Sequence, residues 1–268
     1  MAYLGPKGTF TQKAAQTFAA AHKNPMVLLP LIDIDTIFEN VLHGICDIGV
    51  IPIENSTEGA VNVTLDALLR EEKIVITSLI SMPISHVLMG YDTGKILAHP
   101  QALAQCRQYI RKNYPDAELM PCTSNADAAK RVADKASGAA IGPLFAADEY
   151  RLSTIDTNIQ DSKHNCTAFI QIEKATDNYA HIAKKGMRTS IIFSTKNEPG
   201  ALYKMLGILD KNRVNMTKIL SRPLAHKPGE YVFFVDIEGY KEADAAKALK
   251  EIEQEAVVYR FLGSYRAW

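Results

Sequence analysis

The chain has 268 residues, of which 47% are hydrophobic, and its 30 basic residues balance 30 acidic residues. This length and apolar content predict one large or two modest domains with a real core, and the neutrality argues against nucleic acid or an anionic membrane as the main partner. No apolar run approaches 18 residues and no basic, then apolar, leader precedes Tyr3, so we expect neither a membrane span nor a secretory signal.

Short apolar strands alternate with amphipathic helices from the start of the chain. We expect strands at residues 2–4, 26–31 and 48–53, and helices at residues 11–22, 35–43 and 62–70. The turn GPKGT, residues 5–9, would present free amides at a helix start, which favours an anion. No GK[ST] motif follows, so a carboxylate fits better than a nucleotide, with an ordinary strand-to-helix turn as the alternative.

A strand-rich segment, residues 73–89, is expected to carry the chain into a second lobe. Its His86 lies in an apolar run, and we expect a core histidine with one satisfied hydrogen bond rather than a catalytic base. The second lobe repeats the rhythm, with strands at 96–98, 117–120 and 139–141, helices at 100–113, 125–135 and 144–150, and a return beginning at Ile155. Thr123 and Ser124 follow a strand and precede a helix, which suits an anionic oxygen, although capping explains Ser124 equally well.

Residues 165–173, NCTAFIQIE, form the predicted return strand. Its Cys166 is expected to be a small filler, because the sequence places no base beside it. The four cysteines include no CxxC pair, so we do not expect a structural zinc site. We expect the thiols to be reduced, in a cytoplasmic protein.

Residues 174–186 lose their hydrophobic periodicity and are predicted to form a linker. The pattern then becomes strand, helix, strand, strand, helix, strand, with strands at 187–194, 216–224, 231–238 and 258–262, helices at 199–212 and 243–255, and a polar turn at 225–230. This order predicts a ferredoxin-like βαββαβ domain.

The stretch most typical of a ligand site is GVIPIENSTEGAV, residues 49–61. A β-branched strand ends here, and short polar side chains, among them Asn55 and Ser56, follow directly at its carboxyl end before Gly59. Ligands of open α/β sheets bind beyond the carboxyl ends of strands. A capped loop is the alternative, because Asn and Ser are common turn residues.

PIENS with Gly59 and Val61 resembles the signature loop of the prephenate dehydratase family. YLGPKGTFTQ (3–12), HPQALAQC (99–106) and SNADAAKRVA (124–133) resemble further motifs of that family, and the C-terminal third resembles its ACT domain. The resemblance covers nearly the whole chain, in order. It implies an α/β fold with a bilobal, periplasmic-binding-protein-like catalytic domain, residues 1–174, whose lobes are 1–80 plus 160–174 and 81–159. A ferredoxin-like ACT domain would follow at 187–268.

The resemblance implies a lyase that decarboxylates and dehydrates prephenate to phenylpyruvate in L-phenylalanine biosynthesis, under feedback by L-phenylalanine. Formation of an aromatic ring drives this reaction, so no cofactor or metal is expected. Thr167 would assist departure of the ring hydroxyl. The residues implied for substrate binding are Thr9, Asn55, Ser56, Thr123, Ser124, Asn165 and Phe169. Those implied for binding L-phenylalanine are Gly200, Ala201, Leu202, Asn215, Ser221, Arg222 and Pro223. Effector sites of the family form between paired small domains, which implies a homodimer or homotetramer.

Two positions depart from the family pattern. The return strand reads Thr167-Ala168-Phe169 where the family has Thr-Arg-Phe, and that arginine is thought to hold a substrate carboxylate. A charge-assisted hydrogen bond contributes about 1.5–3 kcal/mol, so we predict that the chain without this arginine is a poor dehydratase. Lys7 is the nearest alternative cation in the motifs. Leu220 replaces a glutamate of the effector motif, which puts the strength of feedback in doubt.

Four other functions fit the sequence. An arogenate dehydratase or a non-aromatising prephenate decarboxylase would differ in product, since only aromatisation yields phenylpyruvate. A catalytically weak amino-acid sensor is compatible with Ala168, and prephenate turnover would exclude it. A solute-binding protein of similar bilobal build would need an export signal, which we do not expect.

Overall fold

The structure is a computed structural model that describes residues 1–176, 187–224, 230–239 and 243–267. Most of the predicted linker and of the predicted polar turn at 225–230 therefore lies outside the described residues. The chain divides into two compact units: Met1–Ile37, Gly49–Thr64 and Ser81–Phe169 form the first, and Phe38–Ile48, Leu65–Ile80 and Ile170–Trp268 form the second. The elements that supply residues to both units are α2 (Ile34–Leu42), α3 (Asn62–Arg70), β3 (Ile48–Asn55), β5 (Ile74–Pro83) and β11 (Cys166–Lys174).

The amino-terminal strands of the first unit run parallel. β1 (Ala2–Leu4) pairs on one side with β2 (Leu29–Leu31) and on the other with β3. Helix α1 (Phe10–Ala21) connects β1 to β2 and buries a stripe of small and aromatic side chains, among them Ala14 and Phe18. The short β4 (Gly59–Ala60) turns back antiparallel onto the end of β3, so the PIENS loop is a tight reversal at the carboxyl end of a buried strand.

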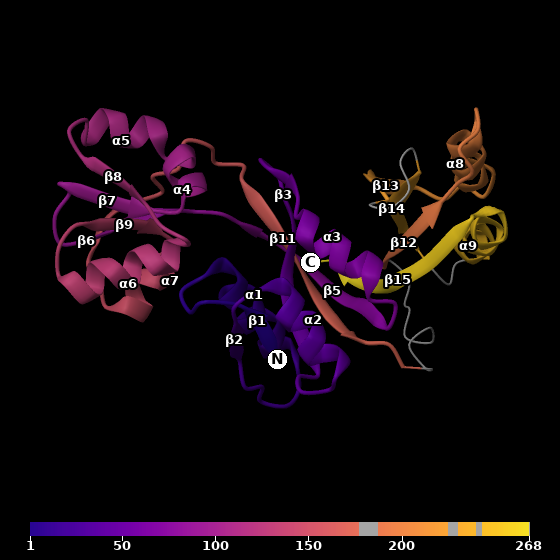
Figure 1. Ribbon diagram of the computed structural model, residues 1–268, viewed down its shortest axis with the longest axis horizontal. Helices are drawn as coiled ribbons and strands as arrows, with labels where there is room; N and C mark the ends of the chain where they lie inside the picture. The colour runs from indigo at the N-terminus through magenta and orange to yellow at the C-terminus, as the bar shows by residue number, and fades with distance from the viewer. Residues whose placement is uncertain (177–186, 225–229, 240–242, 268) are drawn as a thin grey trace. The chain divides into compact units, whose positions relative to one another are not determined.

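A five-stranded sheet forms the rest of the first unit, in the order β10-β6-β9-β7-β8. Its strands are β6 (Val87–Gly90), β7 (Lys95–Ala98), β8 (Glu118–Pro121), β9 (Ala139–Gly142) and β10 (Thr154–Thr157). Helices α4 (Pro100–Gln105) and α5 (Arg107–Asn113) cover one face, and α6 (Asn125–Lys135) and α7 (Leu144–Tyr150) cover the other (Figure 1). Successive strand residues point to opposite faces, so Leu88 packs with α4 and α5 while Val87 and Met89 pack with α6 and α7.

The carboxyl-terminal part of the second unit is the predicted βαββαβ domain. Strands β12 (Arg188–Ser194), β13 (Met216–Pro223), β14 (Tyr231–Glu238) and β15 (Val258–Ala267) pair antiparallel in the order β13-β14-β12-β15. Helices α8 (Ala201–Lys211) and α9 (Ala243–Glu255) supply Met205, Leu209, Leu249 and Ile252 to a core with the strands. The predicted ferredoxin-like arrangement is confirmed.

Three predicted elements differ from the structure by more than one or two residues at an end. The helix predicted at 100–113 is broken at Cys106, where φ and ψ of −114° and 17° separate α4 from α5. The strand predicted at 26–31 begins only at Leu29. The strand predicted at 258–262 continues to Ala267 and pairs in parallel with β5 through Arg266 and Ala267. This last pairing joins residues nearly two hundred positions apart, which no local pattern reveals.

Candidate functional site

The carboxamide of Asn55 joins the end of β3 to the start of β11. Its Nδ2 donates to Thr167 Oγ1 at 2.8 Å and to Asn165 Oδ1 at 2.9 Å. Its Oδ1 accepts from the backbone N–H of Thr57 at 2.9 Å and of Glu58 at 3.2 Å. Both amide protons and the carbonyl oxygen are thus already bonded within the protein, so Asn55 orients its neighbours more readily than it contacts a ligand.

Thr167 keeps its hydroxyl proton for another partner. Its Oγ1 accepts the Asn55 bond, and no described residue is positioned to accept the hydroxyl proton of Thr167. Thr167 is only 9% exposed, and it lines a cavity. Since a hydroxyl has one donor and two acceptor sites, the Asn55 bond leaves Thr167 as a hydrogen-bond donor to whatever occupies that cavity.

Ser56 and Asn165 fasten the PIENS loop to β11 and do not line the cavity. The backbone N–H of Ser56 donates to the carbonyl of Cys166 at 2.8 Å, and the N–H of Cys166 donates to Ser56 Oγ at 2.9 Å. Asn165 is buried, and its Oδ1 accepts from Thr57 Oγ1 at 3.2 Å as well as from Asn55. Their geometry fits a supporting shell around Thr167, not direct substrate contact.

The cavity has a volume of about 420 Å³ and lies within the first unit. Six of the residues predicted for the catalytic site line it, namely Thr9, Asn55, Thr123, Ser124, Thr167 and Phe169. No Lys, Arg, Asp or Glu belongs to the lining within the described part of the chain. A ligand anion would therefore meet dipoles and hydroxyl groups instead of a side-chain cation.

Two long helices begin at this cavity. Thr9 is the N-cap of α1 and accepts from the N–H of Gln12, and Ser124 is the N-cap of α6 and accepts from the N–H of Asp127. The first residues of both helices line the cavity, including Phe10 and Asn125. The positive end of a helix dipole and its free amides favour anions. This geometry agrees with the carboxylate expected at the GPKGT turn.

His86 is a core histidine with one hydrogen bond, as predicted. The residue is 2% exposed, and its Nε2 lies 2.9 Å from Gln105 Oε1. Burial lowers the pKa of His86, although the Gln105 bond opposes this effect, so the ring is neutral at pH 7. Phe10 packs edge-on against it, with ring centroids 5.9 Å apart.

Besides His86, five polar residues of the cavity wall were not predicted as site residues, namely Thr11, His99, Gln101, Gln105 and Asn125. His99 caps α4 through Nδ1, which accepts from the N–H of Gln101 at 3.3 Å. Gln101 and Gln105 are four positions apart and so share one face of the helix. The spacing of the two glutamines in HPQALAQC is the sequence signal that indicates a polar helix face.

Ala168 does not line the cavity, although both its neighbours do. Alternation along β11 directs position 168 to the strand face opposite Thr167 and Phe169, and Ala168 is partly buried there. An arginine at this position would reach the ligand only through its long side chain.

The residues predicted to bind L-phenylalanine do not all meet within one chain. Gly200, with φ +80°, is the N-cap of α8 and follows shortly after the end of β12. The last residue of β12, Ser194, pairs with Val232 of β14. Pro223 pairs with Tyr231, so Ser221–Pro223 lie at the same end of the sheet.

Asn215 lies at the opposite end of this sheet, where its carbonyl accepts from the N–H of Glu238 at 3.0 Å. Arg222 forms an ion pair with Asp66 of α3, so its guanidinium already has an acidic partner. The described chain thus places Asn215 at the end of the sheet away from Gly200, and it gives the guanidinium of Arg222 a partner within the same chain.

The fold and the site together define a class of protein: an α/β protein with a small neutral cavity and a βαββαβ module. The family model for prephenate dehydratase matches residues 1–177, and the model for the ACT domain matches residues 189–256. The chain therefore belongs to the prephenate dehydratase family. No helix of the described residues is long and apolar enough to cross a membrane.

Known proteins of similar sequence and structure agree with this family. A prephenate dehydratase of Methanocaldococcus jannaschii is 39% identical, and the match covers 98% of this chain and 96% of the relative. The crystal structure of a prephenate dehydratase from Arthrobacter aurescens in complex with L-Phe is 31% identical, with a TM-score of 0.86 and coverage of 98% and 89%. A structure described as GqqA, a quorum quenching acylase, is 27% identical, with a TM-score of 0.88 and coverage of 100% and 97%. The predicted fold class is confirmed.

Proposed function

We propose that this protein is a prephenate dehydratase, which converts prephenate to phenylpyruvate, carbon dioxide and hydroxide. The single observation that supports this most directly is Thr167, a buried hydroxyl whose oxygen accepts from Asn55 and whose proton remains available to the cavity. The similar proteins of M. jannaschii and A. aurescens carry this activity in their names.

The reaction needs anion binding and help for a leaving group. The bond between the ring carbon and its carboxylate breaks, its electron pair enters the ring, and the hydroxyl on the opposite ring carbon leaves with its own bonding pair. The resulting aromatic ring supplies the driving force. Thr167 would donate a hydrogen bond to the departing oxygen, and the N-termini of α1 and α6 would each receive a carboxylate.

The same geometry disfavours acylase activity in this cavity. A serine- or threonine-type acylase needs a hydroxyl beside a general base. Thr167 instead accepts from an amide, and His86 Nε2 is occupied by Gln105. Among the lining hydroxyls that the structure describes, only that of Thr123 is hydrogen-bonded to a carboxylate, and none is bonded to a histidine. Its partner Asp127 is a poor general base, because Arg131 binds both carboxylate oxygens and the hydrogen bonds hold the pKa of Asp127 below its usual range.

Steady-state assay of prephenate with and without L-phenylalanine tests the proposal. We expect phenylpyruvate formation and its inhibition by millimolar L-phenylalanine, with a matching binding heat or thermal shift in the intact protein. The support is the ACT domain together with the L-Phe complex of the A. aurescens enzyme.

We further propose a cytoplasmic homodimer or homotetramer in which paired small domains complete the effector site from Gly200–Leu202 and Ser221–Pro223. Absence of turnover would contradict the dehydratase, and absence of any L-phenylalanine response would contradict the effector site.

The substitution Ala168→Arg is predicted to raise kcat/KM for prephenate at least roughly tenfold, the low end of one charge-assisted hydrogen bond. The reason is that no cation belongs to the cavity lining of the described chain, whereas the substrate carries two negative charges. Both forms are compared by phenylpyruvate formation at matched pH and salt. The charge-neutral Ala168→Gln, of similar reach, is the control. A gain equal to that of the glutamine form would mean that the helix N-termini already hold the carboxylates.

A second candidate substrate is arogenate, whose ammonium group reduces the net negative charge of the ligand by one. The absence of Lys and Arg from the described lining favours a less anionic ligand, and Gln101, Gln105 and Thr123 offer acceptors to an ammonium group. Parallel assays with prephenate and arogenate decide between them by kcat/KM, since their products, phenylpyruvate and phenylalanine, are distinguishable.

A further inference from the structure

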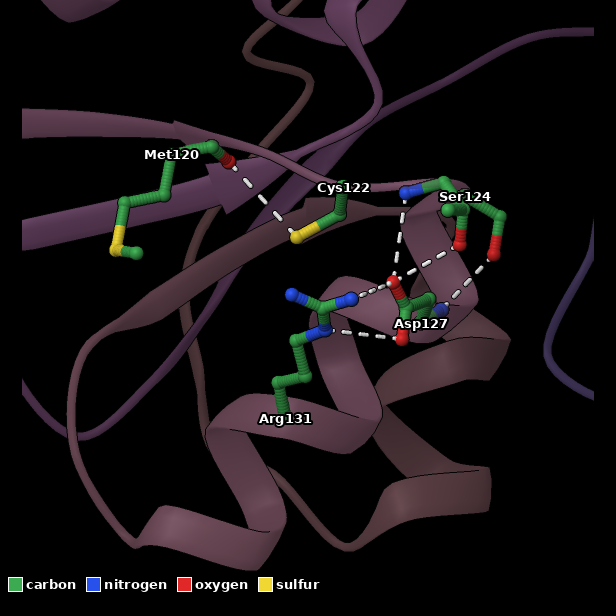
Figure 2. A network of polar contacts seen from close by, with 6 residues as sticks. Met120, Cys122, Ser124, Asp127 and Arg131 are labelled. Carbon is green, nitrogen blue, oxygen red and sulfur yellow. Dashed lines mark hydrogen bonds and ion pairs between the residues drawn. The ribbon is translucent and has the colours of Figure 1, made fainter.

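The first turn of α6 carries a polar network that binds the hydroxyl of Thr123. Asp127 accepts from Thr123 Oγ1 at 2.9 Å and, through the same carboxylate oxygen, from the Thr123 N–H at 3.4 Å. Arg131, one turn later, holds both carboxylate oxygens, with Nε at 3.0 Å and one terminal nitrogen at 2.9 Å. Figure 2 shows Asp127 between Arg131 and the start of the helix. The carboxylate is therefore clamped on two sides.

This network fixes where the proton of Thr123 lies. Partial burial raises the pKa of Asp127, but the hydrogen bonds from Arg131 and Thr123 outweigh it and hold the pKa below its usual range. Asp127 is ionised at neutral pH and accepts only, so the single hydroxyl proton of Thr123 points at it. Thr123 lines the cavity and has only oxygen lone pairs left to offer there.

The neighbouring hydroxyl, that of Ser124, has the opposite hydrogen-bonding role. Ser124 Oγ accepts from the N–H of Asp127 at 2.9 Å, and no described residue accepts the Ser124 hydroxyl proton. Ser124 can therefore donate to a ligand, while Thr123 can only accept. At the start of α6, two adjacent residues of the cavity wall therefore differ: Thr123 binds a donor group of the ligand, and Ser124 binds an acceptor group.

We propose that Asp127 is a positioning residue that makes Thr123 an acceptor for the ring hydroxyl of prephenate and not a ligand for its carboxylates. The inference rests on the proposed function, because prephenate at neutral pH has two carboxylates and a ketone, which only accept, and one hydroxyl, which is its sole donor. The ring hydroxyl then donates to Thr123 and accepts from Thr167, so its oxygen lone pair faces the residue that assists its departure. Ser124 and the α6 amides remain for an anionic oxygen.

Asp127→Ala tests the role, with prephenate and phenylpyruvate as paired ligands. We expect prephenate to bind about tenfold more weakly, the loss of one hydrogen bond, measured by calorimetry and as KM. Phenylpyruvate lacks the ring hydroxyl, so its inhibition constant should change less than about twofold, within the ordinary scatter of a surface substitution. Equal weakening of both ligands would show that the helix start had merely loosened and would overturn the proposal. Because phenylpyruvate also lacks the ring carboxylate, a selective loss of prephenate binding supports the proposal only together with a double-mutant cycle.

A double-mutant cycle with Thr123→Val adds a second readout. Thr123→Val keeps the side-chain shape and leaves the ion pair of Asp127 with Arg131 in place, so it remains informative even if Asp127→Ala fails to fold. If Asp127 acts through Thr123, the aspartate substitution has no further effect on prephenate binding in the valine background. Additive effects would overturn the proposal. Asp134→Ala, an exposed acid of the same helix, is the matched control and should bind both ligands normally.

Failure of this inference and failure of the proposed function are distinguishable. If the wild-type protein binds prephenate without turning it over, the dehydratase assignment falls, whereas the comparison of binding between prephenate and phenylpyruvate still decides the role of Asp127. If turnover is normal and Asp127→Ala weakens both ligands equally, the function stands and the positioning role falls.

Discussion

Replacement of Thr167 by alanine is expected to lower kcat for prephenate by roughly 10²-fold or more, with little change in KM, as for loss of a general acid. Thr167 lies 9% exposed in the cavity wall, and its oxygen accepts from Asn55 at 2.8 Å. That bond directs the hydroxyl proton away from Asn55 and toward the cavity. The contribution grows as the leaving oxygen acquires charge, so its loss affects the transition state more than the bound substrate.

Two further variants separate chemistry from packing. Thr167→Ser keeps the hydroxyl and should retain turnover within about tenfold, whereas Thr167→Val keeps the shape and should fall with the alanine form. Steady-state phenylpyruvate formation and calorimetric binding of prephenate give kcat and affinity separately. Wild-type-like turnover of Thr167→Ala would remove this residue from the mechanism.

Elements with strong local signals could be predicted from the sequence. The bounds of α3, α6, α7, α9 and β14 coincide with the predicted ranges. In α6, the cap Ser124 and the left-handed Ala136 at the end explain why both boundaries are local properties of the chain. The break at Cys106 has no comparable signal, because the residues around it are good helix formers.

The site could be predicted only as a set of residues. Sequence and resemblance selected Asn55, Thr123 and Thr167, and all three line one cavity. Their hydrogen-bonding state depends on partners far along the chain or on the far side of a turn, as for Asn55 and Thr167, 112 positions apart. The direction of a proton is a property of the network, so sequence could not show that Asn55 is saturated or that Thr123 accepts only.

The last strand was the largest error of the fold prediction, and its geometry explains why. The predicted strand ends at residue 262, directly before Gly263. In the structure β15 passes this glycine with φ +147°, at an irregularity in the pairing with β12, and continues to Ala267 beside β5. Gly263 is needed because the backbone of β5 approaches it closely.

The substitution Gly263→Ala is therefore expected to destabilise the second unit severely. A Cβ at this position would lie 2.1 Å from the carbonyl oxygen of Ile76 and 3.1 Å from its carbonyl carbon. Both are backbone atoms of a buried strand and cannot rotate away. Overpacking costs about 1–3 kcal/mol and a strained φ about 1–3 kcal/mol more, a large share of a typical stability of 5–15 kcal/mol.

Scanning calorimetry should show the transition of the Gly263→Ala variant lowered by at least about 5 °C, or a second, earlier transition if the small domain unfolds separately. Gly207→Ala is the matched control. Gly207 lies inside α8 and nothing lies within 4 Å of its hypothetical Cβ, so alanine there should be neutral or stabilising by about 0.5–1 kcal/mol. A Gly263→Ala variant that melts like the control would mean that β15 does not run against Ile76 in solution, and that the chain ends its last strand where the sequence pattern does.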